Sequence, residues 1–481
     1  MRRWLSFLVF LYSLVASAQE TQFEQMRKEL GENSLPLVNM IVDIANVRKT
    51  NFVPGEIEIA DFLRRTDTST DLVRYHCKYK IRGNSSSRFE KKSFAVKLTD
   101  EFGDDMDANI FGLREENNWI LDAMANDRIR MRNRVCFDVW NEMSHTPYET
   151  KFDNRNGTLG QFCEVFINGD YHGLYCMTDK IDRKLLGLKK AKVSDEGDVT
   201  IKGLLYKGVS WGIGSNLLSY EEADVDKDTW NAWELQYPDD YPSIDTWQPL
   251  MDLIDFCSNK TSNELFRQEW ENWFYKDNLA DYVVFTLALG VHDNVYKNIF
   301  LSTVNIQKAH QYFLSPWDMD RSLDGQYNGS LSQINRYNRI APFNRLTVQN
   351  IDGFKDLQVG KWREYYETLF SCESISKRLD DYGKIFSASG AWNREYAKWN
   401  GNPAPLKENI ADELEYVKDW YAKNYESLCN QFGVEIPGGI TSVQSAATQG
   451  NCIYTIDGRR VEGGMMNKGI YIVNGKKMVV R

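Results

Sequence analysis

Hydrophobic and polar positions alternate through much of the first 180 residues, and this alternation predicts β-strands. The predicted strands cover residues 37–44, 56–59, 72–81, 93–98, 162–167 and 171–178. The dipeptide Asn168-Gly169 separates the last two strands and favours a type I′ turn. These two strands should therefore form a hairpin.

A helical period replaces the alternation in other segments. Helices are predicted at residues 22–30, 128–143, 278–289 and 360–430, and residues 215–280 also show helical periodicity. Asp127 is a candidate cap for the second of these helices. Two short apolar runs, 299–301 and 312–314, predict a further hairpin. The pattern as a whole predicts an α+β protein.

The first 18 residues have the pattern of a secretory signal peptide. Two arginines at positions 2 and 3 precede the apolar run 4–15, and small residues at 16–18 are typical of a cleavage site. The mature chain should begin near Gln19 with an N-terminal segment that ends at residue 36. No other stretch approaches the roughly 20 apolar residues that span a bilayer. We therefore expect an exported protein of the periplasm, cell surface or medium that does not span a membrane.

Strands and glycine turns alternate at the other end of the chain, in residues 453–481. Asn474-Gly475 is a strong hairpin signal, and Pro437 marks a boundary before this region. Residues 440–481 are predicted to form a small all-β tail. The strands at 458–461 and 468–473 make the tail resemble the C-terminal sorting domains of the type IX secretion system of Bacteroidetes. A β-sandwich remnant or a docking hairpin is the alternative interpretation.

Composition places the chain among large globular proteins. Its 481 residues, 42% hydrophobic and 26% charged, are too many for one minimal core and fit two lobes with an appendage. A formal net charge of −10 and a pI near 5.3 exclude a general affinity for nucleic acid.

Cysteine and tryptophan contents add two further expectations. The eight cysteines show no CxxC or His-Cys spacing, which argues against a zinc site, and Cys163 and Cys176 are a possible cross-strand disulfide. Nine of the 14 tryptophans lie between positions 230 and 399. They are expected as core and interface anchors, or else on a carbohydrate-binding face.

The segment 290–301, followed by 315–320, contains the residue types that phosphoryl transfer requires. Asp293 precedes Asn298 by five residues, as in the protein-kinase catalytic loop, where the Asp accepts a hydroxyl proton and the Asn binds a metal. The predicted hairpin would return Asp318 to this pair, and a metal would lie between Asn298 and Asp318. Asp320 is a further candidate ligand, which could instead pair with Arg321 or bind a second metal.

The alternative is that an Asp and an Asn at this spacing occur by chance, as they do in most chains of this length. The Trp-Asp-x-Asp turn that returns after a hairpin-sized interval favours the functional interpretation. His292, flanked by apolar residues, is interpreted as a hydrogen-bonded structural residue rather than a base.

A loop of small and hydrogen-bonding residues between two predicted strands is the candidate phosphate loop. It comprises Arg82, Gly83, Asn84, Ser85 and Ser86. The next strand contains Lys97, and nucleotide kinases use this layout to cover phosphates with backbone N–H groups and pair them with a lysine. Lys92 is a rival for the role of Lys97, and Glu142 or Glu164 is a possible partner of that lysine. A plain turn and a solvated lysine are the simpler alternatives.

Several motifs occur along the chain in one order. They lie at residues 82–86, 91–98, 118–121, 132–133, 166–175, 292–298 and 316–320. Together they resemble the CotH (spore-coat protein H) kinase family over roughly residues 37–425. In the segment 178–182, Asp179 stands where members of that family commonly have Glu, which puts the role of this acid in doubt.

The resemblance implies a divergent two-lobed protein-kinase-like fold, with an N-lobe at about 37–180, a C-lobe at about 181–430, and the tail at 440–481. It implies an enzyme that uses ATP and Mg²⁺ or Mn²⁺ to phosphorylate serine or threonine of secreted or surface proteins. Asp293 then matches the catalytic Asp, Asn298 the metal-binding Asn and Asp318 the metal-binding Asp.

Two functional hypotheses follow. The first is an exported, metal-dependent protein kinase. The second is a catalytically silent surface protein of the same fold that binds a protein or glycan through its aromatic C-lobe. The complete set of Asp293, Asn298 and Asp318 favours the first, whereas an extracellular compartment poor in ATP favours the second.

Overall fold

The computed structural model describes residues 20–62, 72–212, 214–295 and 297–436, and three short strands near the C-terminus. The chain forms two compact units, Met1–Val434 and Glu435–Arg481. The predicted signal peptide, residues 1–18, lies outside the described residues. In the described part of the chain, no helix is long and apolar enough to cross a membrane.

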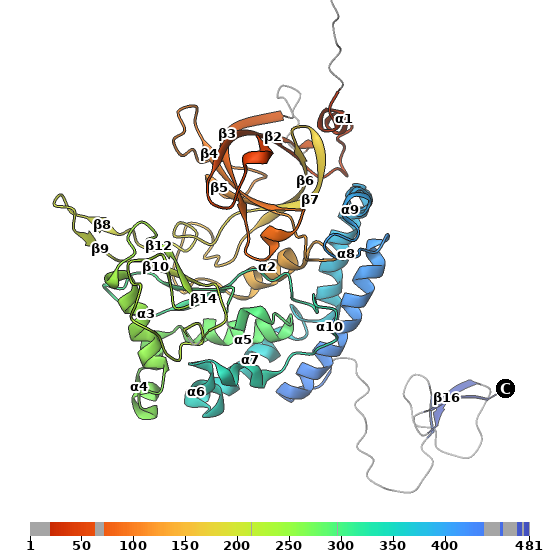
Figure 1. Cartoon of the computed structure of the whole chain (residues 1–481). Helices are drawn as coiled ribbons and strands as arrows, with labels where there is room; N and C mark the ends of the chain where they lie inside the picture. Colours follow the sequence, from red (N-terminus) through yellow and green to blue (C-terminus); the bar gives the residue numbers. More distant parts are fainter. Residues whose placement is uncertain are drawn as a thin grey trace, which may run out of the picture. The chain divides into compact units, whose positions relative to one another are not determined.

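Seven strands of the first unit close into a barrel in the order β1-β2-β3-β4-β5-β7-β6 (Figure 1). They are β1 Leu37–Ile41, β2 Val53–Ala60, β3 Leu72–Arg82, β4 Ser93–Thr99, β5 Asn118–Asp122, β6 Gly160–Ile167 and β7 Asp170–Thr178. The parallel pairing of β1 with β6, in which Leu37 lies opposite Glu164, closes the barrel. The sequence pattern does not predict this closure, because the paired residues are far apart in the chain.

Alternation within each strand builds the barrel core. On β4, Phe94, Val96 and Leu98 are buried in the hydrophobic cluster of the barrel, so Lys97 lies on the outer face. The alternation does not predict β5, because its central residues, Trp119 to Leu121, are all buried.

The predicted hairpin of β6 and β7 is confirmed. Asn168 and Gly169 both have positive φ, as a type I′ turn requires. The possible disulfide in this hairpin is wrong, because Cys163 lies opposite Tyr175 and Phe162 lies opposite Cys176. This offset of one residue places the two thiols on opposite faces of the sheet, and both are free.

Helix α2, Arg132–Met143, begins four residues later than predicted. The carboxylate of Asp127 nevertheless accepts hydrogen bonds from the backbone N–H groups of Met131 (2.8 Å) and Arg132 (2.7 Å). Asp127 therefore satisfies free N–H groups at the start of this helix, as the sequence predicts.

A second, five-stranded sheet has the order β11-β12-β10-β13-β14. Its strands are β10 Leu204–Gly208, β11 Thr229–Trp230, β12 Trp233–Tyr237, β13 Ile299–Thr303 and β14 Phe313–Pro316. β13 and β14 form the predicted hairpin, with Leu301 opposite Leu314. The helical prediction for residues 215–243 is wrong, because part of this segment pairs with β10 as strand β12.

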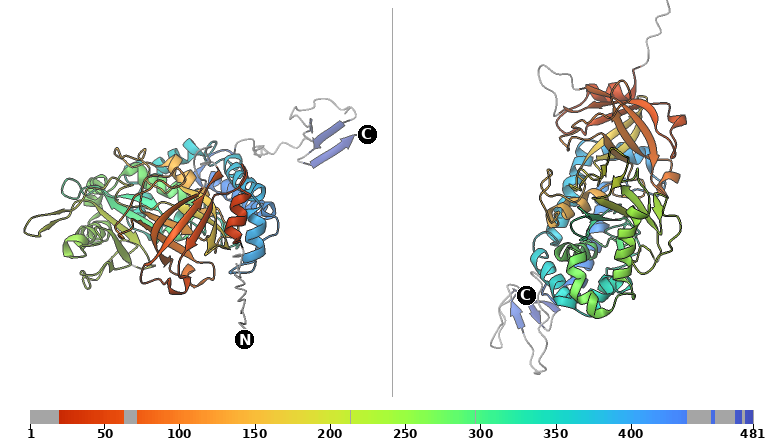
Figure 2. Two further views of the ribbon diagram at one scale, coloured as in Figure 1. Left: turned by 90° about the horizontal axis from the view of Figure 1, so that it is seen from above. Right: turned by 90° about the vertical axis from the view of Figure 1, so that its left-hand side faces the viewer.

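Helices cover the sheet and complete the unit (Figure 2). They are α1 Gln22–Lys28, α3 Ile244–Cys257, α4 Asn263–Trp273, α5 Lys276–Ala288, α6 Phe343–Val348, α7 Phe354–Tyr365, α8 Cys372–Ala388, α9 Ala391–Trp399 and α10 Ile410–Phe432. Every residue of α5 from Asn278 onward is buried, which is typical of a central core helix. Helix α9 packs on barrel strand β7, and the pair α8 and α10 continues from it (Figure 1).

The tryptophans between positions 230 and 399 belong to the core. Trp230, Trp233, Trp247, Trp270, Trp362, Trp392 and Trp399 are all buried, and Trp273 and Trp317 are half-buried. The expectation of core anchors is confirmed. These side chains do not form an exposed carbohydrate-binding face, because burial removes their rings from solvent.

The second unit contains three antiparallel strands, β15 Ile453–Thr455, β16 Gly469–Val473 and β17 Lys476–Val480. Val473 lies opposite Lys476, as a two-residue hairpin requires, while the turn residues Asn474 and Gly475 lie outside the described residues. The boundary residue Pro437 also lies outside them.

Candidate functional site

A turn between α5 and β13 carries the predicted catalytic pair. Asp293 begins a short 3₁₀ turn, and its Oδ2 lies 3.2 Å from the Nζ of Lys297. Asn298 has a φ of 56°, a conformation that asparagine tolerates better than most residues. The Asn298 N–H donates to the carbonyl of Gly208 (2.9 Å), and its carbonyl accepts from the N–H of Trp317 (2.8 Å). The sheet therefore fixes the position of Asn298.

Asn294 strengthens this connection. Its Nδ2 donates to the carbonyls of Asn298 (2.8 Å) and Trp317 (2.6 Å), and its own carbonyl accepts from the hydroxyl of Tyr282 on α5 (2.6 Å). One buried amide thus ties the catalytic turn to the returning strand, and the core helix supports it.

The hairpin brings Asp318 to this turn, as the sequence predicts. Asn298 Nδ2 lies 3.5 Å from the backbone carbonyl of Asp318. The next N–H, that of Met319, donates to Asn133 Oδ1 on α2 (2.6 Å), and Asn133 Nδ2 donates to Asp122 Oδ2 (3.1 Å). Asp122 ends barrel strand β5. Helix α2 therefore fixes the Asp318 turn relative to the barrel.

Like charges gather at this point. Burial, with the neighbouring Asp122, raises the pKa of Asp318, while Lys207, Lys297 and Arg82 lower it. The residue keeps contact with solvent, so a ligand can reach it although surrounding atoms restrict the water at its carboxylate.

Asp320 lies beside Asp318 but has different partners. Burial and the charge of Asp318 raise its pKa well above the usual range. Its Oδ2 accepts a hydrogen bond from Asn126 Nδ2 at 3.2 Å. Among the described residues, no ion pair joins Asp320 to Arg321.

Three cations lie in this part of the site. Arg82 from the end of β3 and Lys207 on β10 both interact with Asp318, and Lys180 after β7 lies near these two cations. Burial lowers the pKa of each one; Arg82 further lowers the pKa values of both lysines by repulsion. Arg82 and Lys207 each lie 5.6 Å from the centre of the Trp317 ring. In the part of the chain that the structure describes, none of the three has an ion-pair partner within 4 Å. Such a cluster of repelling cations is suited to an anion with several charges.

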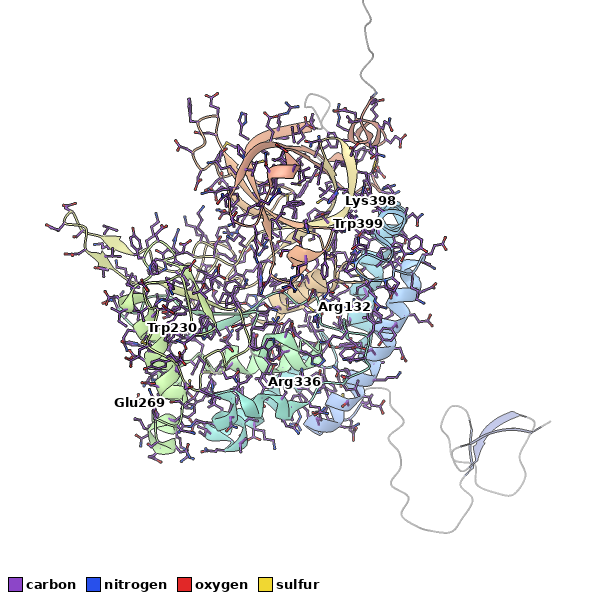
Figure 3. All side chains as sticks on the ribbon, viewed as in Figure 1. Arg132, Trp230, Glu269, Arg336, Lys398 and Trp399 are labelled. Carbon is purple, nitrogen blue, oxygen red and sulfur yellow. The ribbon has the colours of Figure 1, made fainter. Side chains whose placement is uncertain are left out.

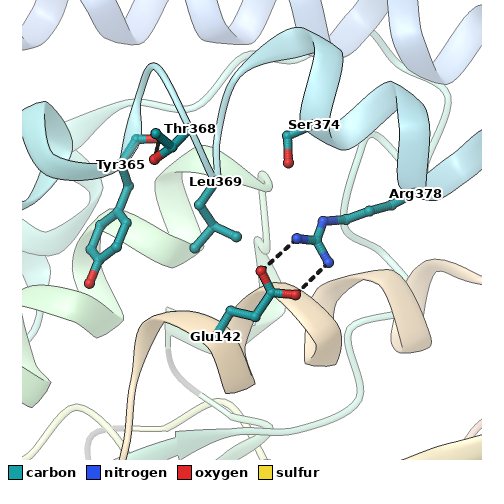
Figure 4. Close-up of a pocket in the computed structure, with 6 residues that line it drawn as sticks. All are labelled: Glu142, Tyr365, Thr368, Leu369, Ser374 and Arg378. Atoms are coloured by element: carbon teal, nitrogen blue, oxygen red, sulfur yellow. Dashed lines mark hydrogen bonds and ion pairs between the residues drawn. The ribbon is translucent and has the colours of Figure 1, made fainter.

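Lys97, which the sequence predicts to pair with the phosphates, instead pairs with a carboxylate of the protein. Lys97 Nζ pairs with Asp105 at 2.8 Å, on the outer face of β4. The two possible partners pair elsewhere, because distant helices supply arginines: Glu142 with Arg378 (2.7 Å) and Glu164 with Arg394 (2.6 Å). Neither glutamate is ion-paired with Lys97 in the described residues. Figure 4 shows Glu142 and Arg378 on the wall of a surface pocket.

The loop after Arg82 has a compact geometry. Gly83 has a φ of 94°, and a Cβ there would lie 2.1 Å from Ser86 Oγ, so the position requires glycine. Asn84 and Ser85 are exposed. Lys92 Nζ donates to the carbonyl of Ser87 within the same loop (2.9 Å).

The buried Lys–Glu pair near this loop is Lys91 with Glu395, and the sequence does not predict it. Lys91 Nζ lies 2.6 Å from Glu395 Oε1, and Arg130 Nε lies 2.7 Å from the same oxygen. All three side chains are at most 1% exposed. Burial alone would raise the pKa of Glu395, but Lys91 and Arg130 together lower it. The cluster joins the loop before β4 to helix α9.

His292 and Asp179 each contact arginine side chains of the protein. His292 contacts Arg336, which Figure 3 labels, and burial lowers the pKa of this histidine to about 4. Asp179 is fully buried, and its Oδ2 lies 3.0 Å from both Arg114 and Arg155. The acid that departs from the family pattern is therefore the centre of a buried ion-pair network.

The donor chemistry of the site fits a hard divalent cation. Asn298 and Asp318 present amide and carboxylate oxygens, which Mg²⁺ prefers. Over the described ranges, no group of three or more His, Cys, Asp or Glu side chains is arranged to hold a metal. The remaining ligands would be water and substrate phosphates, as is usual for Mg²⁺.

The fold and the site together define an α+β protein with cations and oxygen donors where a barrel and an open sheet meet. A family model described as "CotH kinase protein" matches residues 79–428. The chain belongs to this family, whose membership suggests a kinase-type enzyme. No curated protein matches the chain.

Several residues at this site have no clear signal in the sequence. They are Asp122, Asn126, Lys180, Lys207 and Lys297. Asp122 ends barrel strand β5 and Lys207 lies on β10 of the second sheet, and only the packing of these strands in the fold brings both near Asp318. Lys180 lies in segment 178–182, which matches the family pattern, but the residue type alone does not predict a role for this lysine.

Proposed function

We propose that this protein transfers the γ-phosphate of ATP to serine or threonine hydroxyls of secreted or surface proteins, with Mg²⁺ or Mn²⁺. The observation that carries this proposal is the cluster of Arg82, Lys180 and Lys207, in which Arg82 and Lys207 lie near Asp318. Three cations without an ion-pair partner in the described residues suit a triphosphate, and Asp293 lies one turn away to accept a hydroxyl proton.

Each group has one role in this proposal. Arg82, Lys180 and Lys207 bind the phosphates, and Asn298 with Asp318 would hold the divalent cation. When bound, this cation would neutralise charge on the β- and γ-phosphates. Asp293 orients the hydroxyl and takes its proton. The loop 82–86 covers the phosphates in the same scheme, while Lys97 and Lys92 remain at its edge.

The proposal extends to fold and location. The barrel region would form the N-lobe and the helix-rich region the C-lobe of a divergent kinase-like fold. Residues 1–18 would direct export, and residues 440–481 would act as a sorting tail. Deleting residues 440–481 should leave a protein that binds ATP but stays in the periplasm; normal amounts in the medium would contradict a sorting role.

The central experiment measures transfer of labelled phosphate by the mature chain, with and without Mg²⁺ or Mn²⁺. Asp293→Asn should preserve folding, because the amide has the same shape, and should lower transfer on the order of a hundredfold or more. Asp419→Asn, at an exposed ion pair with Lys423, is the matched control. An inactive wild-type chain that also fails to bind ATP would favour the silent surface protein.

A further inference from the structure

Lys297 lies beside Asp293, the acid that would take the hydroxyl proton. Its Nζ is 3.2 Å from Asp293 Oδ2, and the two side chains are 26% and 18% exposed. The backbone N–H of Lys297 also donates to the carbonyl of Asp293 (3.2 Å), which closes the turn that carries both residues. The ammonium group is therefore held beside the acid that would take the hydroxyl proton.

The same ammonium group acts on Asp318. Lys297 is among the cations that lower the pKa of Asp318. The next residue, Asn298, is hydrogen-bonded through its backbone to Trp317, the residue before Asp318. The turn that carries Asp293 and Lys297 is thus joined through Asn298 to the segment that carries Asp318.

On the proposed function, the phosphoryl group is transferred between the segment that carries Asp318 and the turn that carries Asp293 and Lys297. The acceptor hydroxyl lies at Asp293, and the β- and γ-phosphates lie near Asn298 and Asp318. We propose that Lys297 is a catalytic residue that leaves Asp293 and donates hydrogen bonds to the γ-phosphoryl oxygens of ATP. This inference rests on the proposed kinase activity.

The step balances without a proton from Lys297. A bond forms between the hydroxyl oxygen and the γ-phosphorus, and the bond from that phosphorus to the β,γ-bridging oxygen breaks. The electron pair leaves with ADP, and the hydroxyl proton passes to Asp293. Lys297 stays protonated and stabilises charge on the oxygens of the transferred group, which is strongest in a site with little water.

The test compares Lys297→Met, Lys297→Arg and the control Lys423→Met. Lys423 forms an exposed ion pair with Asp419 at the same i,i+4 spacing, 2.6 Å long. Calorimetry gives the affinities for ATP and ADP with Mg²⁺, and a single-turnover assay gives the transfer rate. Lys297→Met should lower transfer on the order of a hundredfold and ATP affinity about tenfold. ADP affinity should stay within about twofold, because ADP lacks the γ-phosphate. Lys297→Arg should restore part of the rate.

Two results would overturn this inference alone. One is an active wild-type chain with an unchanged transfer rate in Lys297→Met. The other is an equal loss of ATP and ADP affinity, which would mean that Lys297 only neutralises Asp293 and maintains the turn. A wild-type chain that transfers no phosphate would instead overturn the kinase assignment, and this inference with it.

Discussion

Two clusters of charged side chains, both near the loop that joins β3 to β4, differ in how their charges are compensated. In the closed cluster, Glu395 accepts from Lys91 and Arg130, and all three side chains are sealed from solvent. In the open cluster, Arg82 and Lys207 face Asp318 without an ion pair shorter than 4 Å in the described part of the chain.

This difference suits the closed cluster to stabilising the fold and the open cluster to binding a ligand. A buried charge that is paired and hydrogen-bonded has its desolvation cost offset within the protein. In the open cluster, Arg82 lowers the pKa values of Lys180 and Lys207 by repulsion, and protein carboxylates offset only part of it. An anionic ligand would supply the close ion pairs that these cations lack in the described residues. Gly173 shows how tightly the closed cluster is packed, since a Cβ there would lie 2.8 Å from Glu395 Oε2.

The largest effect is expected from removing the proposed metal ligand of the open cluster. Asp318→Ala should abolish Mg²⁺-dependent binding of ATP, because the change removes a direct oxygen ligand. Asp320→Ala should weaken binding only about tenfold, since Asp320 is engaged by Asn126 and would support the site indirectly. Calorimetric titration of ATP with and without Mg²⁺ measures both. An equal or larger loss in Asp320→Ala would mean that Asp320 is the ligand.

The next effect breaks the closed cluster. Glu395→Gln should lower the free energy of unfolding by about 3–5 kcal/mol, because it leaves Lys91 and Arg130 buried without a counter-charge. Denaturant unfolding followed by circular dichroism measures this change. Asp381→Asn, which removes an exposed ion pair with Lys377, is the control and should leave the unfolding midpoint unchanged. Matching midpoints for the two variants would remove the distinction between the clusters.

A third substitution should change ATP binding and the free energy of unfolding in different directions. Lys207→Met should weaken ATP binding about tenfold, or ~1.4 kcal/mol, through loss of a charged phosphate contact. The same change should preserve or raise the free energy of unfolding, since it removes repulsion with Arg82 and Lys180. Lys227→Met, at an exposed pair with Asp224, is the control. Clear destabilisation by Lys207→Met would show that this lysine stabilises the fold, as the closed cluster does.

The smallest effect concerns pH. Burial lowers the pKa of His172, beside the closed cluster, and of His292, beside the open one, to about 4. Between pH 6.5 and 4, the unfolded chain binds protons that the folded chain excludes, so these histidines make stability fall as pH falls. Each contributes a slope of at most about 1.4 kcal/mol per pH unit. Unfolding at pH 7, 5.5 and 4.5 should show a shallower fall in a His172→Gln, His292→Gln double variant, and parallel curves would refute this account.

The sequence alone determined the features that depend on near neighbours. Strand β4 follows from alternation, the β6–β7 turn follows from the left-handed conformation that Asn168 and Gly169 tolerate, and α5 follows from its apolar run. The approach of Asp318 to Asn298 also belongs here, because a short hairpin connects them. These features are local, because each depends on a few residues that are close together in the sequence.

Only the tertiary structure decided the closure of the barrel and the partner of each charge. Lys97 pairs with Asp105, while Lys91 is paired with Glu395, which follows it by 304 residues. Lys207 approaches Asp318 because β10 pairs with β13 and β13 pairs with β14, which ends two residues before Asp318. Arg82 reaches the same carboxylate from the barrel. A long side chain pairs with whichever opposite charge the packed core brings within a few ångströms. That distance depends on how distant segments pack, and no local spacing in the chain contains it.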